Sequence, residues 1–509
     1  MTRTRDRRER RLRTFRHVLE QRDRPVELNP ASQIAAGSPA IRGVVRDRTA
    51  GILIALVIAA AFLRLWGLGA DRLNFGEAFT AMAGRLSLGD LFQFLRVRDS
   101  HPPLDYLLHA PLAQLGVNEF LFRLPSALCS IAAVALFAWW MRHRGLAGIV
   151  ATGLLAVSAF QLVHGRQARM YADMELIGVA AAVLADAWLR RPRRWHAPTI
   201  GALVVLGLLT HVSMFLLGAG LLLLAGRRTD REAWRWRGGL AAGALGWGVL
   251  WGPSFLVQTK GGFSDWIPRT TVAGMVNNFG RLVTYEAGLH VLALIAVGLG
   301  AIVLCRADRR LGRVWVCCVL VPCGLAALTG TVAPVLLDRT LTVVAWGPLL
   351  AIGFLVAAAT KRSRLVGALS IALLAVVMVP AALNVVTERS NPDLVLRHIA
   401  SVARPGDVVA IHPAGRFHEL VWSLGVQGDP YRVVSVPGLA HTKGLQLGPT
   451  RNRSGRTWLL DWTGHRLRLR PQATCAPDWT RAGAHLHCLS NVHGATRGNV
   501  PRSGGVRAG

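Results

Sequence analysis

The sequence predicts an all-α polytopic membrane protein that ends in a small α/β domain. Three observations predict this class. The chain of 509 residues has a mean hydropathy of +0.36, with 52% apolar and 17% charged residues. Its apolar residues gather in runs of about 20, the length that a helix needs to cross a bilayer. After residue 385 the long runs give way to short apolar stretches that are typical of strands.

Eleven apolar runs are the predicted transmembrane helices. Only Thr210 and His211 separate the fifth run from the sixth, and one long tilted span over 197–226 is the alternative, which would invert all later topology. The runs cover residues 50–69, 124–140, 145–163, 172–189, 197–210, 212–226, 238–257, 287–305, 314–333, 341–360 and 364–385.

The arginine clusters favour eleven spans over ten. Short cytoplasmic loops carry an excess of Lys and Arg, and with eleven spans every cluster falls on that side. The clusters are the N-terminal tail and residues 141–144, 190–194, 227–237, 306–313 and 361–364. The net charge of +31 therefore marks topology, and a nucleic acid is not an expected partner. The N-terminus is predicted to be cytoplasmic and the segment from 386 extracytoplasmic.

The two ends of the chain are predicted to be disordered. Residues 1–48 are rich in arginine and show no cleavable signal, which indicates a basic cytoplasmic tail that contacts anionic lipid headgroups. Residues 491–509 are rich in glycine and arginine.

Residues 386–490 form the predicted extracytoplasmic α/β domain. Segments 393–403 and 417–424 look helical, and segments 407–411, 431–436 and 457–462 look like strands. Cys475 and Cys488 lie here, and either a disulfide or two free thiols fits an oxidising location. The other five cysteines lie in or beside apolar runs and show no metal-ligand spacing.

Polar residues gather at the ends of the spans on the predicted outer face, beside two long loops at 70–122 and 258–286. Loops of this length between spans are usually functional, and charges at membrane depth usually serve a substrate. Arginines suit a phosphate, and a carboxylate suits a general base. Together they indicate group transfer from a lipid-linked donor. The residues are Glu77, Asp99, His101, Arg123, Arg166, Arg169, Tyr171, His211, Asp265, Arg269 and Arg339.

Several motifs in this region resemble one known family. They are HPPLDYLL at 101–108, RLPSAL at 123–128, GRQARMYA at 165–172, LLTHVSMF at 208–215 and WIP at 266–268. In order and spacing they resemble the family 39 glycosyltransferases of the C-type fold, relatives of the protein O-mannosyltransferases and the lipid A aminoarabinose transferases. The resemblance covers about residues 50–385.

The resemblance implies that residues 49–385 are a membrane glycosyltransferase domain. Its activity would be an inverting transfer of a sugar from a polyprenyl-phosphate donor to a glycan, lipid or protein of the cell envelope, on the outer face. The identity of the sugar and of the acceptor is not indicated. The arginine- and alanine-rich composition is typical of a bacterium with GC-rich DNA, so the expected location is a bacterial cell membrane.

The chain departs from the family at its acidic motif. The family usually carries an Asp-Glu pair ahead of the proline motif, whereas here Gly76 stands at the place of the aspartate and Glu77 remains. Either Glu77 or Asp99 is therefore the candidate catalytic base. A non-catalytic or specialised relative that binds a glycan or a lipid-linked sugar is the alternative.

The remaining roles follow from the resemblance or from residue chemistry. Arg166 and Arg169 would bind the donor phosphate or organise the loop, and Arg339 would face the lipid phosphate. The pocket or loop-organising candidates are His101, Pro102, Pro103, Arg123, Tyr171 and His211, of which Arg123 could instead reach lipid headgroups and His211 could instead cap helix ends. No metal site is predicted, although a divalent metal on His101 with Glu77 or Asp99 is an alternative.

A transporter of lipid-linked sugars is the rival from another class. Transporters usually place polar residues near the bilayer midplane, on interrupted helices and in repeated halves. Here the polar residues gather toward one face, which favours an enzyme.

Overall fold

The structure is a computed structural model of the 509-residue chain. It describes residues 39–71, 73–115, 118–226, 228–260, 267–387, 398, 401–402, 408–412, 432–435, 456–461, 479–481 and 484–490. Three predicted features lie outside these residues: most of the N-terminal tail, the tail at 491–509, and the pairing of Cys475 with Cys488.

The helices occupy the predicted membrane domain. They are α3 (Pro39–Leu65), α4 (Phe75–Gly84), α5 (Leu88–Arg98), α6 (Leu104–Gln114), α7 (Glu119–Met141), α8 (Gly145–Val157), α9 (Ala159–Gly165), α10 (Tyr171–Arg190), α11 (His196–Thr210), α12 (Met214–Ala225), α13 (Arg231–Leu250), α14 (Gly252–Thr259), α15 (Val272–Gly280), α16 (His290–Ala307), α17 (Arg309–Trp315), α18 (Val321–Val332), α19 (Trp346–Arg362) and α20 (Arg364–Thr387). The short 3₁₀-helices are η1 (Ala287–Leu289) and η3 (Asp338–Val344), and η2 (Val316–Leu320) is a short π-helix.

Helices occur at each of the eleven predicted spans, but fewer satisfy the requirements for a span. By length and composition, five helices in the described residues can cross a membrane, or eight spans if each of three bent pairs counts as one. The bent pairs are α8 with α9, α13 with α14, and η3 with α19. Helix α10 carries several charges, and α11 and α12 have only 15 and 12 residues. The count of eleven therefore stays a prediction.

Two helix boundaries bear on the sequence prediction. The first differs from it, and the second bears on the choice between one span and two over 197–226. Helix α3 begins at Pro39, so the end of the predicted disordered tail at 1–48 is helical. The run at 197–226 consists of two helices, because α11 ends at Thr210 and α12 begins at Met214. This break is the one that the eleven-span reading requires.

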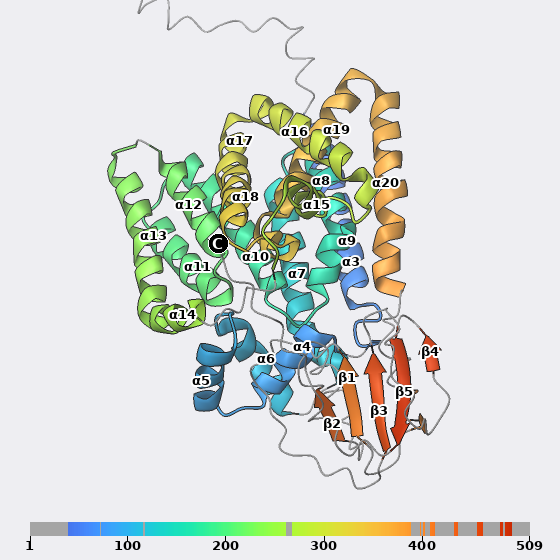
Figure 1. The fold of residues 1–509 in the computed structure, drawn as a ribbon. Coiled ribbons are helices and arrows are strands. Elements are labelled where there is room, and N and C mark those ends of the chain that lie inside the picture. The colour runs from blue at the N-terminus through green and yellow to red at the C-terminus, as the bar shows by residue number, and fades with distance from the viewer. Residues whose placement is uncertain are drawn as a thin grey trace, which may run out of the picture. The chain divides into compact units, whose positions relative to one another are not determined.

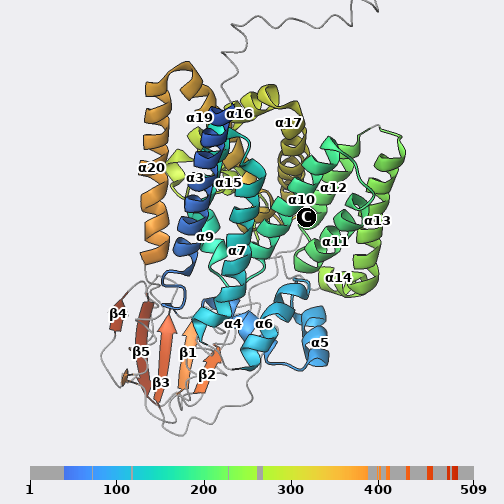
Figure 2. The same cartoon turned by 180° about the vertical axis from the view of Figure 1, so that it is seen from behind.

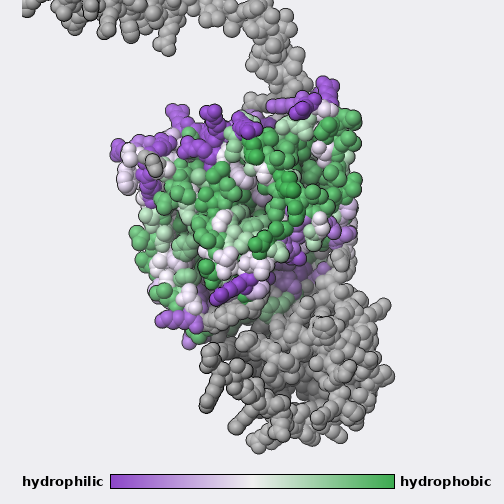
Figure 3. Space-filling view, turned by 45° about the horizontal axis from the view of Figure 1, so that its top comes forward, coloured by the Kyte–Doolittle hydropathy of each residue, from purple (hydrophilic) through white to green (hydrophobic). Residues whose placement is uncertain are grey.

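The helices pack around a core rich in tryptophan and small residues. Helix α10 packs against α7, α8 against α19, and α11 against α13, and Figures 1 and 2 show α11 to α14 as a group on one side of α7 and α10. Trp188 stacks on Trp236 with ring centroids 4.8 Å apart, and Trp140 meets Trp346 edge-on at 5.6 Å. Apolar side chains also cover the outside of the helices, as Figure 3 shows in a broad band with hydrophilic residues along its edges. This is the surface of a membrane protein.

The two predicted outer loops contain helices. The loop at 70–122 forms α4, α5 and α6, and the loop at 258–286 contains α15, with residues 261–266 outside the described part. The prolines of the HPPL motif explain the break between α5 and α6, because Pro103 is the N-cap residue of α6. The loop at 70–122 is thus an ordered helical layer, and it can position side chains.

Near the C-terminus five strands form one sheet in the order β2-β1-β3-β5-β4. The strands are β1 (Val408–His412), β2 (Arg432–Ser435), β3 (Arg456–Asp461), β4 (Trp479–Arg481) and β5 (Ala484–Ser490). Strand β1 pairs in parallel with β2 and β3, whereas β5 pairs antiparallel with β3 and β4. The strands β1, β2 and β3 lie where the sequence predicts them. The predicted helices lie almost entirely outside the described residues, so the α/β domain stays a prediction.

Candidate functional site

The first element of the site is the beginning of α4, which fixes Glu77. The sequence Asn74-Phe75-Gly76-Glu77 forms a capping box, in which an N-cap side chain and the residue three positions later exchange hydrogen bonds with each other's backbone. The Glu77 backbone N–H donates to Asn74 Oδ1 at 3.1 Å, and the Asn74 backbone N–H donates to Glu77 Oε2 at 2.9 Å. Local sequence therefore sets the direction of the Glu77 side chain.

Glu77 is fully buried and held by further donors. Arg123 donates from Nε to Oε1 at 2.7 Å and from Nη2 to Oε2 at 2.8 Å, and the backbone N–H of Ala168 donates to Oε1 at 2.9 Å. Burial alone would raise the pKa of Glu77, but the charge and hydrogen bonds of Arg123 outweigh it and the pKa is lowered. Both oxygens are thus occupied, which suits a structural ion pair better than a base that meets a substrate hydroxyl.

Asp99 lies in a different environment, between α5 and α6. Its Oδ2 accepts a hydrogen bond of 2.5 Å from the Tyr106 hydroxyl, and its Oδ1 lies 2.9 Å from Nδ1 of His101. Burial alone would raise the pKa of Asp99, yet His101, Arg169 and the Tyr106 hydrogen bond together lower it. The side chain of His101 is 23% exposed and that of Asp99 only 9%, so the imidazole is the more accessible end of the pair.

Arg169 joins the two acidic regions from the turn between α9 and α10. It is buried, and its Nη1 donates to Thr80 Oγ1 at 3.0 Å, to the Gly76 carbonyl at 3.3 Å and to the Tyr106 hydroxyl at 3.4 Å. Burial alone would lower the pKa of Arg169. The neighbouring Tyr106, Tyr171, Asp105 and Asp99 outweigh this effect, and the pKa is raised. Of the two roles predicted for Arg169, these contacts favour organising the loop.

His211 closes the cluster from the break between α11 and α12. Its ring centroid lies 5.7 Å from that of His101, and its Nδ1 accepts the Ser213 backbone N–H at 3.1 Å. Burial, together with the charges of Arg169 and Arg339 and the neighbouring His101, lowers the pKa of His211 to about 3, so the ring is neutral at neutral pH. His211 therefore caps the turn and also borders the Asp99 cluster, and a functional role for it stays a prediction.

A second basic group lies at η3. Arg339 is half-buried, and Asp338 beside it forms an ion pair of 3.0 Å with Arg281. Helix α10 meets this turn very closely, because a Cβ placed on Gly178 would lie 2.0 Å from the Val343 carbonyl oxygen. Only glycine allows that approach, which fixes η3 against α10. Arg339 is also close enough to His211 to lower its pKa.

Arg166 and Arg123 both hold protein groups, and for Arg166 these contacts favour the predicted role of organising the loop. Arg166 donates from Nη1 to the carbonyls of Leu63, Arg64 and Trp66 at 2.7, 3.2 and 2.8 Å. It thereby satisfies the open carbonyls at the end of α3. Arg123 pairs with Glu77 and also donates to the carbonyls of Leu68 and Asp71, so it does not reach outward to headgroups.

The other predicted residues are placed as follows. Pro102 and Pro103 are buried in the loop between α5 and α6 that carries Asp99 and His101, here called the cluster loop. Arg269 is exposed. Tyr171 is buried at the start of α10, and its ring lies 4.9 Å from that of His164. Asp265 lies outside the described residues. No three His, Cys, Asp or Glu among the described residues are placed to hold a metal ion, so the metal alternative gains no support.

Sequence reasoning missed four residues at the site. Tyr106 and Thr80 contact Asp99 or Arg169, and Gln258 Nε2 donates to the carbonyls of Leu95 and His101, joining α14 to the cluster loop. Arg281 is the fourth. Tyr106 belongs to the HPPLDY run, so its place one turn after the prolines was a usable signal. Gln258 and Arg281 lie in the predicted outer loop at 258–286, but no local pattern singles out these two residues, and only the tertiary fold brings them to the cluster.

Buried polar atoms continue from the cluster into the helices. Among the described residues, Oδ2 of Asp105, Nε2 of His109, both ring nitrogens of His164 and the side-chain amide of Gln161 have no hydrogen-bond partner, while Oδ1 of Asp105 lies 3.3 Å from Nδ1 of His109. Buried polar groups usually have a partner in the protein, in water or in a ligand. Their number here indicates that this interior accommodates water or a polar ligand.

These features define a polytopic membrane protein with a polar cluster formed by its first large loop and the ends of its helices. No family model matches the sequence, and no curated protein matches it. Its fold is shared with crystal structures of ArnT from Cupriavidus metallidurans. The apo structure matches with a TM-score of 0.57 and 16% sequence identity, over 89% of this chain and 98% of ArnT.

A second structure of the same ArnT is bound to undecaprenyl phosphate. It matches with a TM-score of 0.55 and 16% identity, over 86% of this chain and 97% of ArnT. At this identity the likeness shows the fold: a polytopic helical membrane architecture over most of both chains. Membership of family 39 stays a prediction.

Proposed function

We propose that this protein transfers a sugar from a polyprenyl-phosphate carrier to a hydroxyl of a cell-envelope acceptor, on the outer face of the membrane. Two findings support the proposal: the fold shared with ArnT, one of whose structures holds undecaprenyl phosphate, and the polar cluster around Asp99 and His101. The cluster is the stronger of the two, because Asp99 and His101 are suited to proton transfer and lie near arginines that are suited to bind a phosphate.

The Asp99–His101 pair is the proposed proton acceptor. Asp99 holds Nδ1 of His101, which leaves Nε2 of this partly exposed side chain to meet an acceptor hydroxyl. A carboxylate that holds an imidazole in this way also stabilises the imidazolium that forms. Asp99 is then a positioning residue and His101 the catalytic base. This changes the sequence-based hypothesis, in which Glu77 or Asp99 takes the proton directly.

The bonds change as in any direct inverting displacement. The acceptor oxygen forms a bond to the anomeric carbon while the bond from that carbon to the phosphate oxygen breaks. The hydroxyl proton passes to Nε2 of His101, and the polyprenyl phosphate leaves as an anion. Arg339 and Arg281 are the proposed partners of that anion, since guanidinium groups bind phosphate oxygens through charge-assisted hydrogen bonds.

A binding protein without activity is the second candidate. It is favoured by one observation: glycine replaces the family's usual aspartate at position 76, and the adjacent Glu77 is fully used by Arg123 and backbone N–H groups. In that case the Asp99 cluster would hold a lipid-linked sugar without transferring it.

A donor panel separates the two candidates. Purified full-length protein in liposomes is supplied with radiolabelled polyprenyl-phosphate sugars and a membrane extract as acceptor. We expect label transfer by the wild type and by Asp90→Asn, a matched control because Asp90 is an exposed aspartate of α5, the helix that directly precedes Asp99. The rate of label transfer by Asp99→Asn should be lower than that of the wild type by about 100-fold or more. Binding of donor without transfer by any protein would favour the second candidate, and equal transfer by all would overturn the role of Asp99.

A further inference from the structure

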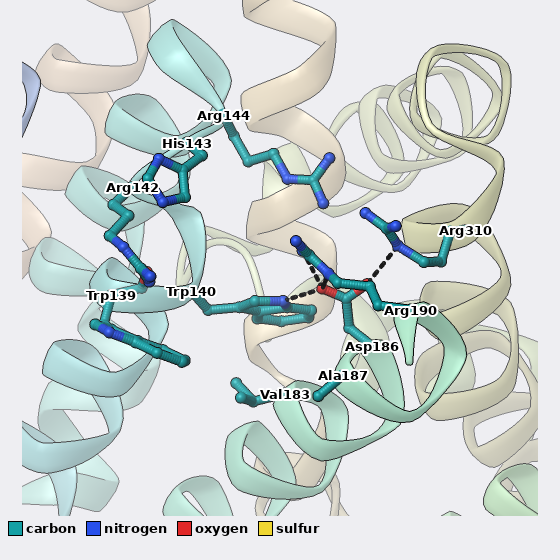
Figure 4. A pocket seen from close by; sticks show the side chains of 10 residues that line it. All are labelled: Trp139, Trp140, Arg142, His143, Arg144, Val183, Asp186, Ala187, Arg190 and Arg310. Carbon is teal, nitrogen blue, oxygen red and sulfur yellow. Dashed lines mark hydrogen bonds and ion pairs between the residues drawn. The ribbon is translucent and has the colours of Figure 1, made fainter. Parts of the chain in front are cut away.

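At the end of α7 and α10 remote from the Asp99 cluster lies a pocket of about 320 Å³. Figure 4 shows its lining, which comes from the α7–α8 turn, the last turns of α10 and the start of α17. Between Arg123 and Arg142, helix α7 rises about 30 Å at 1.5 Å per residue, roughly the thickness of the hydrocarbon core. The pocket and the Asp99 cluster therefore lie near opposite membrane surfaces. On the predicted topology, the pocket faces the cytoplasmic leaflet.

The charge of the pocket is strongly positive. Arg142, Arg144, Arg190 and Arg310 line it with a single carboxylate, Asp186. That carboxylate is already occupied: it accepts from Trp140 Nε1 at 2.9 Å, from Arg310 Nε at 2.9 Å and from Arg190 at 2.5 Å. Arg144 pairs with Asp308, which does not line the pocket.

The arginines also repel one another. Burial lowers the pKa of Arg144, Asp186 opposes that effect, and the nearby charges of Arg190 and Arg310 add to it. Figure 4 shows the guanidinium groups of these three arginines turned toward one space above Asp186. In the described part of the chain, the Nη groups of Arg310 have no recorded hydrogen-bond partner. An anion with several oxygens would satisfy them and relieve the repulsion.

An apolar track leads from this pocket along α7. Leu121, Leu128 and Trp139 are 41%, 52% and 54% exposed, and their spacing places them on one face of the helix. The guanidinium of Arg142 lies over the Trp139 ring, 4.3 Å from its centroid. A basic pocket next to an exposed apolar helix face matches the two ends of a phospholipid: the pocket suits the phosphate, and the apolar face suits an acyl chain. A free phosphate would use only the pocket.

We propose that this pocket binds the phosphodiester headgroup of an anionic membrane phospholipid, with an acyl chain along the exposed face of α7. Basic pockets between transmembrane helices on the cytoplasmic side commonly hold such headgroups. The site goes beyond the proposed sugar transfer, since it lies at the other membrane surface and its test needs no activity.

The test measures lipid that stays bound to the protein. Full-length protein is reconstituted in phosphatidylcholine nanodiscs that contain a small share of phosphatidylglycerol, and after extraction the bound lipids are counted by native mass spectrometry. We expect the wild type to retain phosphatidylglycerol, and Arg142→Gln and Arg310→Gln to retain at least fivefold less. Arg309→Gln is the matched control, because Arg309 is exposed, is the neighbour of Arg310 and does not line the pocket.

Three outcomes would overturn the proposal: equal retention by all four proteins, displacement of the lipid by millimolar inorganic phosphate, or retention of phosphatidylcholine as strongly as phosphatidylglycerol. Size-exclusion profiles check folding. If Arg310→Gln fails to fold, Arg142→Gln decides the question, because among the described residues Arg142 makes its hydrogen bond and its ring contact with the exposed Trp139.

Discussion

The hydroxyl of Tyr106 donates a hydrogen bond of 2.5 Å to Oδ2 of Asp99. Tyr106 is fully buried, and burial together with the Asp99 charge raises its pKa, so the tyrosine remains a protonated donor. The hydrogen bond therefore stabilises the ionised form of Asp99, and that form is the one that can hold His101.

Replacement of Tyr106 by phenylalanine tests this relationship through pH. The pKa of Asp99 is lowered in the folded protein, so Asp99 loses its charge only below the ordinary carboxyl range of about 4. Loss of one hydrogen bond to a charged group, worth about 1.5–3 kcal/mol, should raise that pKa by roughly one to two units. Asp99 and His101 form one hydrogen-bonded proton-accepting pair, so the acid limb of transfer reports protonation of the pair, and we expect it to move to higher pH in Tyr106→Phe, as measured by initial rates between pH 3.5 and 7. An unmoved acid limb would contradict the role of Tyr106.

Arg123→Gln should destabilise the protein without touching the proposed base. The change leaves the Glu77 carboxylate buried without its counter-ion, a loss of about 3–5 kcal/mol for a pair of this kind. Thermal unfolding in detergent, followed by fluorescence, should show a markedly lower Tm than the wild type. The double variant Arg123→Gln with Glu77→Gln should recover part of the loss, since no unpaired charge remains. A Tm equal to that of the exposed control Arg309→Gln would contradict a structural ion pair.

The fold was predictable to the extent that hydropathy reports it. The break at His211, the positions of α7 and α16, and strands β1 to β3 follow from runs and turns that the sequence displays. Strand β5 was missed although it alternates Leu486 and Cys488 with His485 and His487, a recognisable pattern.

Most contacts of the candidate site could not be predicted from local sequence patterns. Nothing in the neighbourhood of Glu77 or Arg123 indicates that they pair across 46 residues. The two roles predicted for Arg166 stayed open because its carbonyl partners are about 100 residues away in sequence.

Gly76→Asp tests how the site works without the family's usual aspartate. A Cβ at position 76 would lie 3.4 Å from Cδ of Arg169, which is ordinary van der Waals contact, so the side chain fits. Its carboxylate would lie beside the Arg169 guanidinium. We expect Gly76→Asp to restore transfer in Asp99→Asn by roughly tenfold, because the new carboxylate can itself accept the proton of the acceptor hydroxyl, while Gly76→Asn, of the same size, restores none. Equal effects of aspartate and asparagine would show that charge at position 76 is irrelevant.

Arg281→Gln and Arg339→Gln test the proposed phosphate site. Loss of one charge-assisted hydrogen bond of about 1.5 kcal/mol should raise the KM for the polyprenyl-phosphate sugar roughly tenfold, with little change in kcat at saturation. Steady-state kinetics over donor concentration measure this split. A lower kcat at unchanged KM in both variants would place the donor phosphate elsewhere.

Chemical rescue of His101→Ala tests the central claim most directly. Removal of the imidazole should lower single-turnover transfer by about 100-fold or more, and added imidazole in the buffer should restore a measurable part of the rate, because it can occupy the vacated space beside Asp99. A folded His101→Ala protein that transfers at the wild-type rate, or whose loss imidazole does not relieve at any concentration, would contradict His101 as the base.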